Sequence, residues 1–482
     1  MRLSVVFKQV VTLLFFLSFS FLVPALYSFL YQDGLTEYFL FPLVFMGALY
    51  FLAFQIKIPK NDISVKEAIL IVVLVWFLFP ALSAMCYMET GAIKSFPDAY
   101  FESVSGFTTT GASILTNIEA LPKSVLLWRS TTHWIGGLGF VVFSLSILPA
   151  IGAGGAQLIR FESSKAVEEK ILPKVKEVAK AILIAYSFLT VAEVVLLKLA
   201  GMNLYEAVTH TFGTVATGGF STKNASVGAF HSPLVETIIA VFMLLGASNL
   251  ALYYRAFKKR SIRYFFSYPE VKSLFIIALI MTFFFTAVLY SEGYYSSLLQ
   301  ALRYAFFQVS TAISTTGFAS TDYSNWPPVL LALIMILSLI GASSGSTAGG
   351  IKQFRFLVLG KTAYGELKKT VHPRLIYRVN LGGKPLEIST LNAIWAFVSI
   401  YFSLTVLFGL IISLSGYDLI TSFSASIACI TSLGPGLGKV GPAGNFAFFS
   451  SFDKLLLSVE MLLGRLEVFP ILAVFIPYFW KD

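Results

Sequence analysis

Long apolar runs alternate with short polar segments over the whole length of this sequence. A helix needs about 20 apolar residues to cross the hydrocarbon core of a bilayer. The pattern predicts ten crossing segments, at residues 9–31, 38–56, 66–90, 124–150, 178–200, 233–257, 271–291, 326–360, 390–415 and 453–480. The first run follows Arg2 and Lys8 and has no clear small-residue cleavage site behind it, which indicates a retained helix rather than a signal peptide.

Four shorter stretches lie between the later runs, and their length fits entry into the membrane without a full crossing. They extend from Pro97 to Phe107, Leu204 to Val215, Leu298 to Ile313 and Tyr417 to Ile430. Non-helical backbone at membrane depth is tolerated only where protein buries it or where it lines a watery path. Four such stretches therefore predict a central path.

The predicted fold is an all-α polytopic membrane protein. Four pseudo-repeated units, each a helix, a pore helix and a second helix, surround the central pore, and an N-terminal helix pair stands outside the repeat. The expected boundaries are 1–60 for the helix pair, and 61–152, 153–260, 261–370 and 371–482 for the four units.

Each short stretch ends in a glycine framed by small or hydroxyl-bearing residues. Gly111, Gly218, Gly317 and Gly434 are separated by 107, 99 and 117 residues, so a unit of about a hundred residues recurs. Glycine adopts dihedrals that strain other residues, which allows successive carbonyls to replace the water shell of a cation. The oxygens expected to line the path belong to Thr109, Thr110 and Gly111, to Ala216, Thr217 and Gly218, to Thr315, Thr316 and Gly317, and to Ser432, Leu433 and Gly434.

The four loops are interpreted as a cation site rather than as helix-packing positions. The partly negative C-terminal ends of the short helices, directed at the axis, favour a cation over an anion. The alternative is that the glycines and threonines only ease helix packing. Four sites in the same context make that alternative the weaker one.

Composition and charge support a membrane protein and exclude most soluble functions. The chain is 57% hydrophobic and only 12% charged, with a mean hydropathy of +0.80. Cys86 and Cys429 both lie in apolar runs, so neither a disulfide framework nor a metal cluster is expected. The net charge of +10 reflects basic residues gathered in 57–66, 160–180, 255–272, 352–384 and at the termini. These segments, and both termini, are predicted to face the cytoplasm rather than to bind nucleic acid.

Two further features interrupt the apolar pattern. The stretch from Gly341 to Gly350 collects weak helix formers, and each glycine inside a helix costs about 1 kcal/mol relative to alanine, which predicts a broken helix. A close helix crossing is the alternative. Arg465 lies near the middle of the last run, where a charge is expected to be functional or paired, here with Glu460 or Glu467. Glu193 also lies inside a run, as a proton-relay or a packing residue.

The four loops and four further motifs resemble the Trk/Ktr family of potassium uptake proteins, specifically its TrkH-type membrane subunits. The motifs are Trp128 to Gly137, Gly341 to Lys352, Val371 to Arg374 and Met461 to Glu467. The resemblance covers nearly the whole chain. The leading helix pair favours the TrkH type over the shorter KtrB type.

The resemblance implies several properties. The chain would take up potassium across the bacterial cytoplasmic membrane, with no bound cofactor and with K⁺ at the filter carbonyls as the transported ion. It implies an intramembrane gate below the filter, and it implies a homodimer and a ring of cytosolic nucleotide-binding regulatory subunits (TrkA type). This chain has no Rossmann glycine fingerprint of its own. The implied gate residues are Gly345, Ser346, Thr347, Ala348, Gly349, Gly350 and Arg465.

Two functional hypotheses follow, a channel-like potassium pathway opened by the partner and a symporter driven by protons or sodium. An intramembrane enzyme is disfavoured because the sequence contains no His-Glu-x-x-His motif and no convincing nucleophile and base pair. Only the glycine recurs in all four loops, and Leu433 and Pro435 flank the fourth. We therefore expect potassium and rubidium to be preferred over sodium less stringently than in a tetrameric channel, with the fourth loop contributing least.

Overall fold

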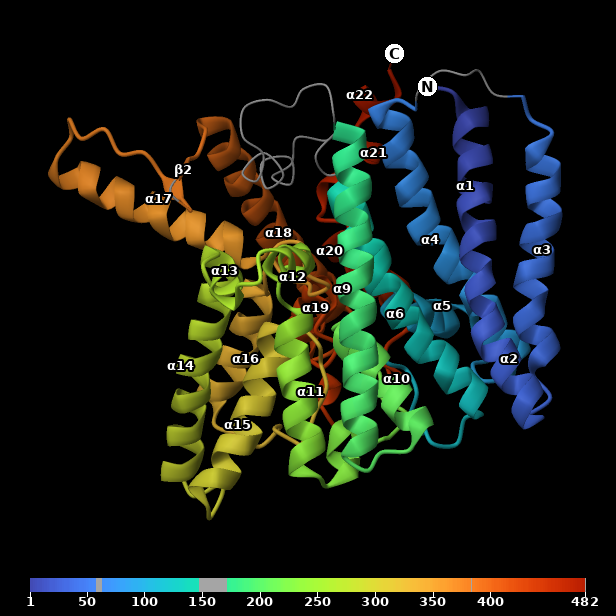
Figure 1. Ribbon diagram of the computed structural model, residues 1–482, viewed down its shortest axis with the longest axis horizontal. Helices are drawn as coiled ribbons and strands as arrows, with labels where there is room; N and C mark the ends of the chain where they lie inside the picture. Colours follow the sequence, from blue (N-terminus) through green and yellow to red (C-terminus); the bar gives the residue numbers. More distant parts are fainter. Residues whose placement is uncertain (58–62, 147–170, 383, 482) are drawn as a thin grey trace.

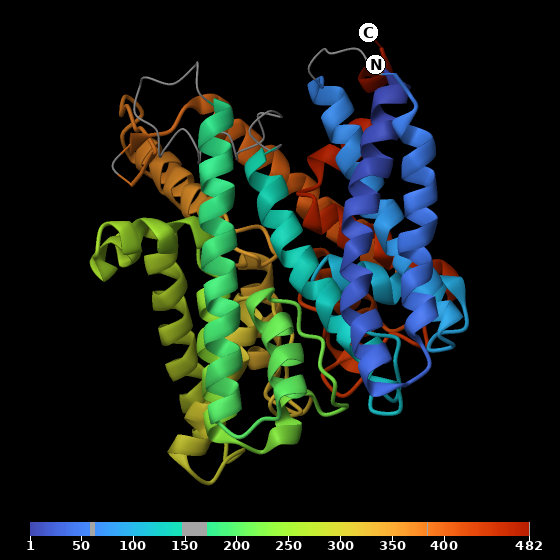
Figure 2. The same ribbon diagram turned by 45° about the vertical axis from the view of Figure 1, so that its right-hand side comes forward.

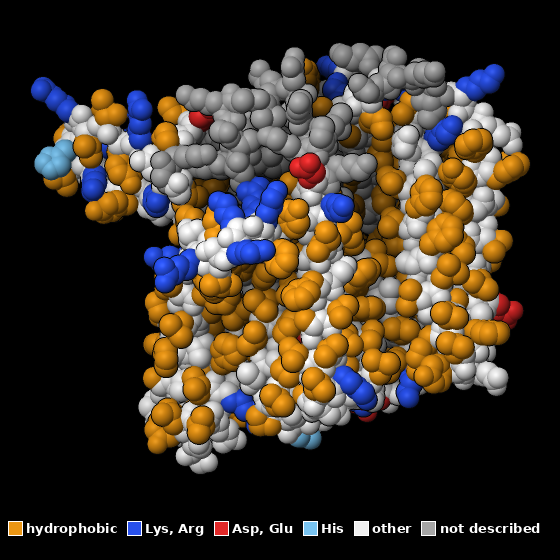
Figure 3. All heavy atoms as spheres, in the orientation of Figure 1, with side chains coloured by type: hydrophobic (Ala, Val, Ile, Leu, Met, Phe, Trp, Pro, Cys, Tyr) orange, Lys and Arg blue, Asp and Glu red, His pale blue; other side chains and the backbone are white. Residues whose placement is uncertain are grey.

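The computed structural model describes residues 1–57, 63–146, 171–382 and 384–481. It is a helical bundle in which both termini lie at the same end (Figure 1). Apolar side chains cover the flank of the bundle, while Lys and Arg gather mainly toward the end that holds the termini (Figure 3). The end of the run predicted at 124–150 and the unit boundaries near 60 and 152 lie outside the described residues.

The N-terminal pair forms as predicted. Helices α1 (Leu3–Ser18) and α2 (Leu22–Tyr31), joined by the 3-10 turn η1 (Phe19–Phe21), make one apolar segment of 29 residues, and α3 (Thr36–Phe54) returns beside it. These helices pack beside α4 (Val65–Glu89), at one edge of the bundle (Figure 2). Ser64 and Glu67 form a capping box that begins α4, and Glu67 also binds Arg2 at 2.7 Å.

Within the described residues, six helices are long and apolar enough to cross a membrane. They are Leu3–Tyr31, Thr36–Phe54, Val65–Glu89, Glu177–Leu199, Pro269–Ser291 and Ile388–Leu414. Five of them are the segment through α1 and α2, α3, α4, α14 (Pro269–Ser291) and α18 (Ile388–Leu414), and the sixth is most of α9 (Ile171–Leu199). Helix α6 (Lys123–Ser146) has the length, but it carries the polar sequence around Arg129 and His133.

Three of the predicted crossings are broken helices. The run 233–257 bends by 88° between α11 (Pro233–Gly246) and α12 (Leu250–Lys258), where the Asn249 side chain caps α12. The last run divides into α20 (Ser451–Arg465), α21 (Phe469–Phe475) and α22 (Pro477–Trp480). The sequence pattern predicted these two runs as crossing segments without indicating a break in either. The predicted break in the third unit is confirmed, between α16 (Pro328–Ile340) and α17 (Gln353–Val371).

Four short helices lie inside the bundle, each between two of the predicted crossing segments. They are α5 (Phe96–Phe107), α10 (Leu204–Val215), α15 (Leu298–Ile313) and α19 (Leu419–Thr431), close to the predicted bounds. Ser95, Asn203 and Asp418 cap three of them by accepting a backbone N–H from the first turn. The C-terminal halves of all four are almost completely buried, so the residues that follow them meet in the interior.

The remaining elements are short. They are α13 (Ile262–Phe266), the 3-10 turns η2 (Ser226–Phe230) and η3 (Gly438–Val440), and a hairpin of β1 (Asn380–Leu381) and β2 (Lys384–Pro385) that follows α17. Helix α17 projects sideways from the bundle (Figure 1). Many apolar side chains on α3, α9 and α14 are exposed, as expected for surfaces that face lipid.

Candidate ion-conducting site

The loops that follow the four short helices share one backbone conformation. Thr109, Thr217, Thr315 and Ser432 have left-handed φ angles of 54°, 54°, 54° and 59°. Two residues later, Gly111, Gly219, Gly317 and Gly434 have φ angles of 82°, 81°, 85° and 91°. The residue between each pair does not have a positive φ. A residue of negative φ between two of positive φ turns successive carbonyls toward the same side, which is the arrangement that a carbonyl-lined ion site requires.

Backbone hydrogen bonds give the same register in all four loops. The N–H of Thr109, Thr217, Thr315 and Ser432 donates to the carbonyl three residues earlier, and the next N–H donates to the carbonyl five residues earlier. This pair of bonds is the Schellman ending of a helix, which satisfies its last carbonyls and fixes the direction of the outgoing chain. Each short helix therefore aims its loop in the same way.

The second loop is displaced by one residue from the predicted register. Its equivalent residues are Thr217, Gly218 and Gly219, whereas the sequence predicted Ala216, Thr217 and Gly218. Ala216 caps the end of α10 in a right-handed conformation, as Thr108 does for α5. Two adjacent glycines made the register ambiguous, because spacing alone does not tell which of them takes the positive φ. The other three loops have the predicted register.

The four loops contact one another in a closed cyclic order. A Cβ on Gly111 would lie 2.2 Å from the Gly218 carbonyl oxygen, and one on Gly219 would lie 2.0 Å from that of Thr316. A Cβ on Gly317 would lie 2.0 Å from the Leu433 oxygen, and one on Gly434 would lie 2.5 Å from the Thr110 oxygen. We call these four glycines the glycine ring. No side chain fits at any of its positions.

A cavity of about 170 Å³ opens onto the glycine ring. All four ring glycines line it, together with residues that follow them in the chain, including Ala112, Phe220, Ala319 and Pro435. Four loops that are separated by about a hundred residues each in the sequence thus line the same small cavity. This convergence is what the sequence pattern predicted.

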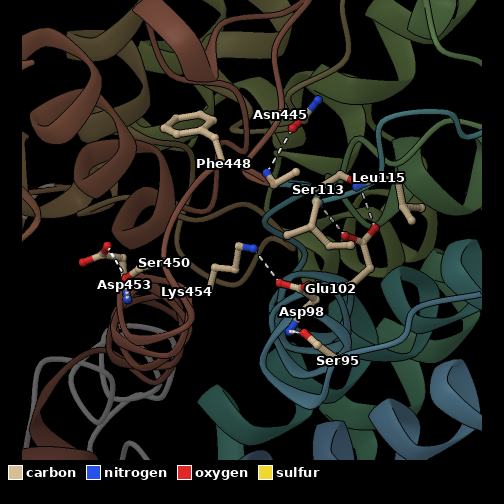
Figure 4. Close-up of polar contacts among 12 residues, drawn as sticks. Ser95, Asp98, Glu102, Ser113, Leu115, Asn445, Phe448, Ser450, Asp453 and Lys454 are labelled. Carbon is tan, nitrogen blue, oxygen red and sulfur yellow. Dashed lines mark hydrogen bonds and ion pairs between the residues drawn. The ribbon is translucent and has the colours of Figure 1, made fainter. Parts of the chain in front are cut away.

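Buried ion pairs brace the segments around the ring. Glu102 of α5 binds Arg129 of α6 at 2.5 Å and also accepts the Ile114 N–H, while Arg129 donates to the Ser221 carbonyl at 2.9 Å. Figure 4 shows Glu102 beside Ser113, whose hydroxyl donates to it at 3.0 Å. The Glu102 and Arg129 pair therefore connects the segment after Gly111 with the segment after Gly219.

Two further ion pairs connect helices that are well separated in the sequence. Lys454 of α20 binds Asp98 of α5 at 2.6 Å, as Figure 4 shows. Arg303 of α15 binds Glu236 of α11 through two hydrogen bonds of 2.5 and 2.6 Å. Sequence reasoning missed these partners because each pair joins residues far apart in the chain.

We expect Arg129→Ala to destabilise the protein by about 3–5 kcal/mol, because it leaves the buried Glu102 carboxylate without its cation. Thermal unfolding of the purified protein in detergent would measure the loss. The matched control is Lys369→Ala, which removes an exposed cation paired with Glu366 and should leave the melting temperature nearly unchanged. Equal melting temperatures for both variants would contradict the bracing role.

The segment between α16 and α17, residues 341–352, lies against the ends of three short helices. We call it the plug loop. The Thr347 hydroxyl donates to the Val215 carbonyl at 2.9 Å and accepts from the Thr217 hydroxyl at 3.2 Å. The Gly349 N–H donates to the Thr315 hydroxyl at 2.7 Å, and the Gly350 N–H donates to the Thr431 carbonyl at 3.0 Å. The plug loop therefore touches the first residues of the second and third ring loops and the residue before the fourth.

Glycine is required in the plug loop by close backbone approach. A Cβ on Gly349 would lie 2.0 Å from the Thr431 carbonyl oxygen. Gly341, Gly345 and Gly350 all have positive φ angles, between 67° and 74°. The predicted glycine-rich break thus packs its backbone directly against the helix ends, where side chains would not fit.

Charged side chains hold the plug loop in place. Arg465, which is 1% exposed, donates to the Thr347 carbonyl at 2.7 Å and to the Gly136 carbonyl at 3.3 Å. The Lys352 ammonium donates to the Ala348 carbonyl, and Glu270 of α14 accepts the Ser344 N–H at 2.6 Å. Glu467, one of the predicted partners of Arg465, binds Arg355 at 2.5 Å. Sequence reasoning missed Lys352 and Glu270; the only signal for Lys352 was its place at the end of the glycine-rich segment.

Comparison with known proteins identifies the family. Residues 36–481 match the family TrkH, which is described as a cation transport protein. The chain is 37% identical over 466 residues to the Trk system potassium uptake protein TrkH of Salmonella typhimurium, covering 96% of each. It is 36% identical to the protein of that name from Vibrio parahaemolyticus, covering all of both chains. This chain belongs to the TrkH family.

A solved TrkH structure has the same fold. The crystal structure of the potassium transporter TrkH from Vibrio parahaemolyticus covers all of both chains with a TM-score of 0.91, at 34% identity. The chain is therefore an all-helical, multi-span membrane protein of the TrkH type, as the resemblance in the sequence implied. The TrkH family is one of transport proteins, not of enzymes.

Proposed function

We propose that this chain takes up potassium through the glycine ring and that the plug loop closes the path on the inner side of the ring. The observation that carries the proposal is the cyclic contact of the four glycines around one shared cavity. The TrkH relatives are named potassium uptake proteins, which supports potassium as the transported ion. The four units would be pseudo-repeats around this path, each presenting one loop.

The proposed filter is made of backbone carbonyls. The short helices direct their partly negative C-terminal ends at the ring, which favours a cation. Carbonyl oxygens that replace the hydration shell of potassium then provide selectivity. The filter residues are Thr109, Thr110 and Gly111, Thr217, Gly218 and Gly219, Thr315, Thr316 and Gly317, and Ser432, Leu433 and Gly434.

The loops differ in a way that predicts modest selectivity. Thr108 and Thr110 share a hydroxyl hydrogen bond of 2.7 Å, and Ser314 and Thr316 share one of the same length. The residues equivalent to Thr110 in the second and fourth loops are Gly218 and Leu433, which have no hydroxyl. Two braced loops alternate with two that lack the brace. We therefore expect rubidium and potassium to be preferred over sodium, but less strictly than in a channel with four identical loops.

The plug loop and Arg465 would form the gate. The loop lies directly against the residues that begin the ring loops, and a buried cation donates to its Thr347 carbonyl. A cation at this depth also raises the barrier for another cation. Opening requires the plug loop to leave these contacts.

Charge supports the proposed orientation and the proposed partners. Basic residues gather near the end that holds the termini, which supports a cytoplasmic location of that end in a bacterial inner membrane, by the positive-inside rule. Lys258, Lys259 and Arg260 are exposed at the end of α12. They offer a docking surface for a cytosolic nucleotide-binding regulatory subunit. A homodimer with one path per chain completes the proposed assembly.

Buried carboxylic acids make proton-coupled symport the second candidate. Glu193 on α9 and Glu460 on α20 are fully buried, as a proton relay would require. In the channel-like function they have packing roles only, and the Ser426 hydroxyl already donates to Glu460 at 2.5 Å. The two functions differ in what drives accumulation.

Rubidium flux into proteoliposomes distinguishes them. With the membrane potential clamped, a channel-like path should not accumulate rubidium beyond its electrochemical equilibrium when a proton or sodium gradient is imposed. Glu193→Gln and Glu460→Gln should keep flux within about twofold of the parent, because each keeps the side-chain size. Gradient-driven accumulation that either variant abolishes would instead establish symport.

A further inference from the structure

His133 lies directly behind the second ring loop. It is on α6 and is completely buried. A Cβ placed on Gly218 would lie 2.4 Å from the His133 Cγ, so the imidazole occupies the space immediately beside the middle residue of that loop. None of the proposed filter or gate roles uses this side chain.

One nitrogen of the imidazole contacts the backbone in the last turn of α5, and the other contacts the backbone just after the second ring loop. Nδ1 lies 2.7 Å from the Gly106 carbonyl oxygen, and the Phe220 N–H donates to Nε2 at 3.1 Å. A carbonyl can only accept and an amide N–H can only donate, so Nδ1 carries the proton and Nε2 offers its lone pair. The two partners thus fix one neutral tautomer.

These two contacts connect the first loop with the second. The Gly106 carbonyl also accepts the Thr109 N–H, which begins the first loop, and Phe220 directly follows Gly219 of the ring. The Phe220 side chain is also fixed by contacts of its ring. The centroids of the Phe220 and His133 rings are 4.2 Å apart, and the Arg129 guanidinium lies 3.6 Å from the Phe220 centroid. The exit of the second loop is therefore clamped by one short segment of α6.

The equivalent positions in two other units cannot make these bonds. Gly136, Gly246 and Gly464 occupy matching places, since a Cβ on them would lie 1.9, 2.9 and 1.9 Å from the Phe107, Val215 and Ile430 carbonyls. Three residues before these glycines stand His133, Met243 and Met461, and both methionines are fully buried. The second loop, which has glycine where the first and third have a braced threonine, is thus the one that receives an imidazole.

We infer that His133 is a positioning residue for ion selectivity, whose neutral imidazole sets the second ring loop against the first. The inference rests on the proposed filter. The imidazole replaces, from outside the loop, the internal hydroxyl brace that Thr110 and Thr316 supply to their own loops. Its loss should relax the ring and admit sodium, while the buried frame of ion pairs keeps the protein folded.

The test compares three substitutions at His133 in full-length protein reconstituted into liposomes. His133→Leu removes both bonds, and His133→Asn keeps only a donor near Nδ1. His133→Gln reaches the Nε2 position with an amide oxygen that can accept the Phe220 N–H. The readout is rubidium uptake in competition with sodium, together with size-exclusion profile and melting temperature. If the leucine variant does not fold, the comparison of the asparagine and glutamine variants tests the inference.

We expect the leucine and asparagine variants, which both lose the bond from the Phe220 N–H, to lower the rubidium-to-sodium preference about tenfold, and the glutamine variant to restore most of it. Met243→Leu, at the equivalent place in the second unit, should leave the preference unchanged. Equal losses in the leucine and glutamine variants, or no loss in either, would overturn the role of His133.

Gly219→Ala separates this inference from the proposed filter. If that variant leaves the preference intact, the ring is not the filter and the proposed function fails. If it alters the preference while all three His133 variants do not, only the inference about His133 fails.

Discussion

Replacement of Gly317 by aspartate is expected to abolish potassium uptake while leaving the protein in the membrane. Gly317 has a φ of 85°, and a Cβ there would lie 2.0 Å from the Leu433 carbonyl oxygen. Any side chain at this position forces the third and fourth loops apart, and a carboxylate also places a fixed charge among the carbonyls. Each 1.4 kcal/mol added to the barrier slows passage tenfold, so a loss of at least about a hundredfold is expected. Gly111→Asp should behave in the same way.

The measurement is growth of a potassium-uptake-deficient bacterial host on limiting potassium, with initial rates of rubidium uptake and quantification of the protein in the membrane fraction. Gly293→Asp is the matched control. Gly293 has a comparable φ of 75°, but a Cβ there meets nothing within 4 Å. This control separates backbone strain from intrusion into the ring. Full rescue by the Gly317 variant would remove the third loop from the ion path.

Arg465→Ala is expected to raise potassium flux in the absence of any cytosolic partner. The guanidinium donates to the Thr347 carbonyl at 2.7 Å and to the Gly136 carbonyl at 3.3 Å, which ties the plug loop to α6. A hydrogen bond to a charged group contributes about 1.5–3 kcal/mol, so the open fraction should rise by about ten- to a hundredfold. Deleting part of residues 345–350 should raise flux further, because it removes the obstruction itself.

Rubidium uptake into proteoliposomes that contain only this chain would measure the effect. Arg465→Lys keeps the charge but not the two-pronged geometry, and it should fall between the parent and the alanine variant. Lys198→Ala removes an exposed cation from α9 and serves as the control. Unchanged flux in both the alanine variant and the loop deletion would contradict the gating role.

Much of the architecture was predictable because its causes are local in the sequence. Apolar run length gave the N-terminal pair and the crossings at α4, α9, α14 and α18, and the short helices fell within a few residues of their predicted bounds. The glycine-rich break at 341–350 was predictable for the same reason, since glycine destabilises a helix wherever it stands.

The features that sequence did not reveal depend on tertiary contacts. The 88° bend after Gly246 falls at Ala247, Ser248 and Asn249, which contain no glycine or proline, and it forms where the plug loop packs. The break after Arg465 rests on left-handed Glu467 and Val468, where only long-range packing holds non-glycine residues. The one-residue shift in the register of the second loop also depends on tertiary contacts, because the neighbouring loops decide whether Gly218 or Gly219 enters the ring.

Selectivity was expected to be weakest at the fourth loop, and the structure adds a second consideration. The hydroxyl braces group the first loop with the third, which leaves both the second and the fourth without one. The second loop is then clamped from outside by His133, while the fourth has Pro435 packed near Gly317. The expectation that the fourth loop contributes least is testable by the same selectivity assay.

The most direct test of the proposed ion path is a structure of this protein in rubidium with anomalous diffraction. We expect an anomalous peak on the axis of the glycine ring, contacted by backbone carbonyls from all four loops, including the second loop in the register Thr217, Gly218 and Gly219. A ring without a peak, or a rubidium ion bound elsewhere by side chains, would contradict the proposal that these four loops form the filter.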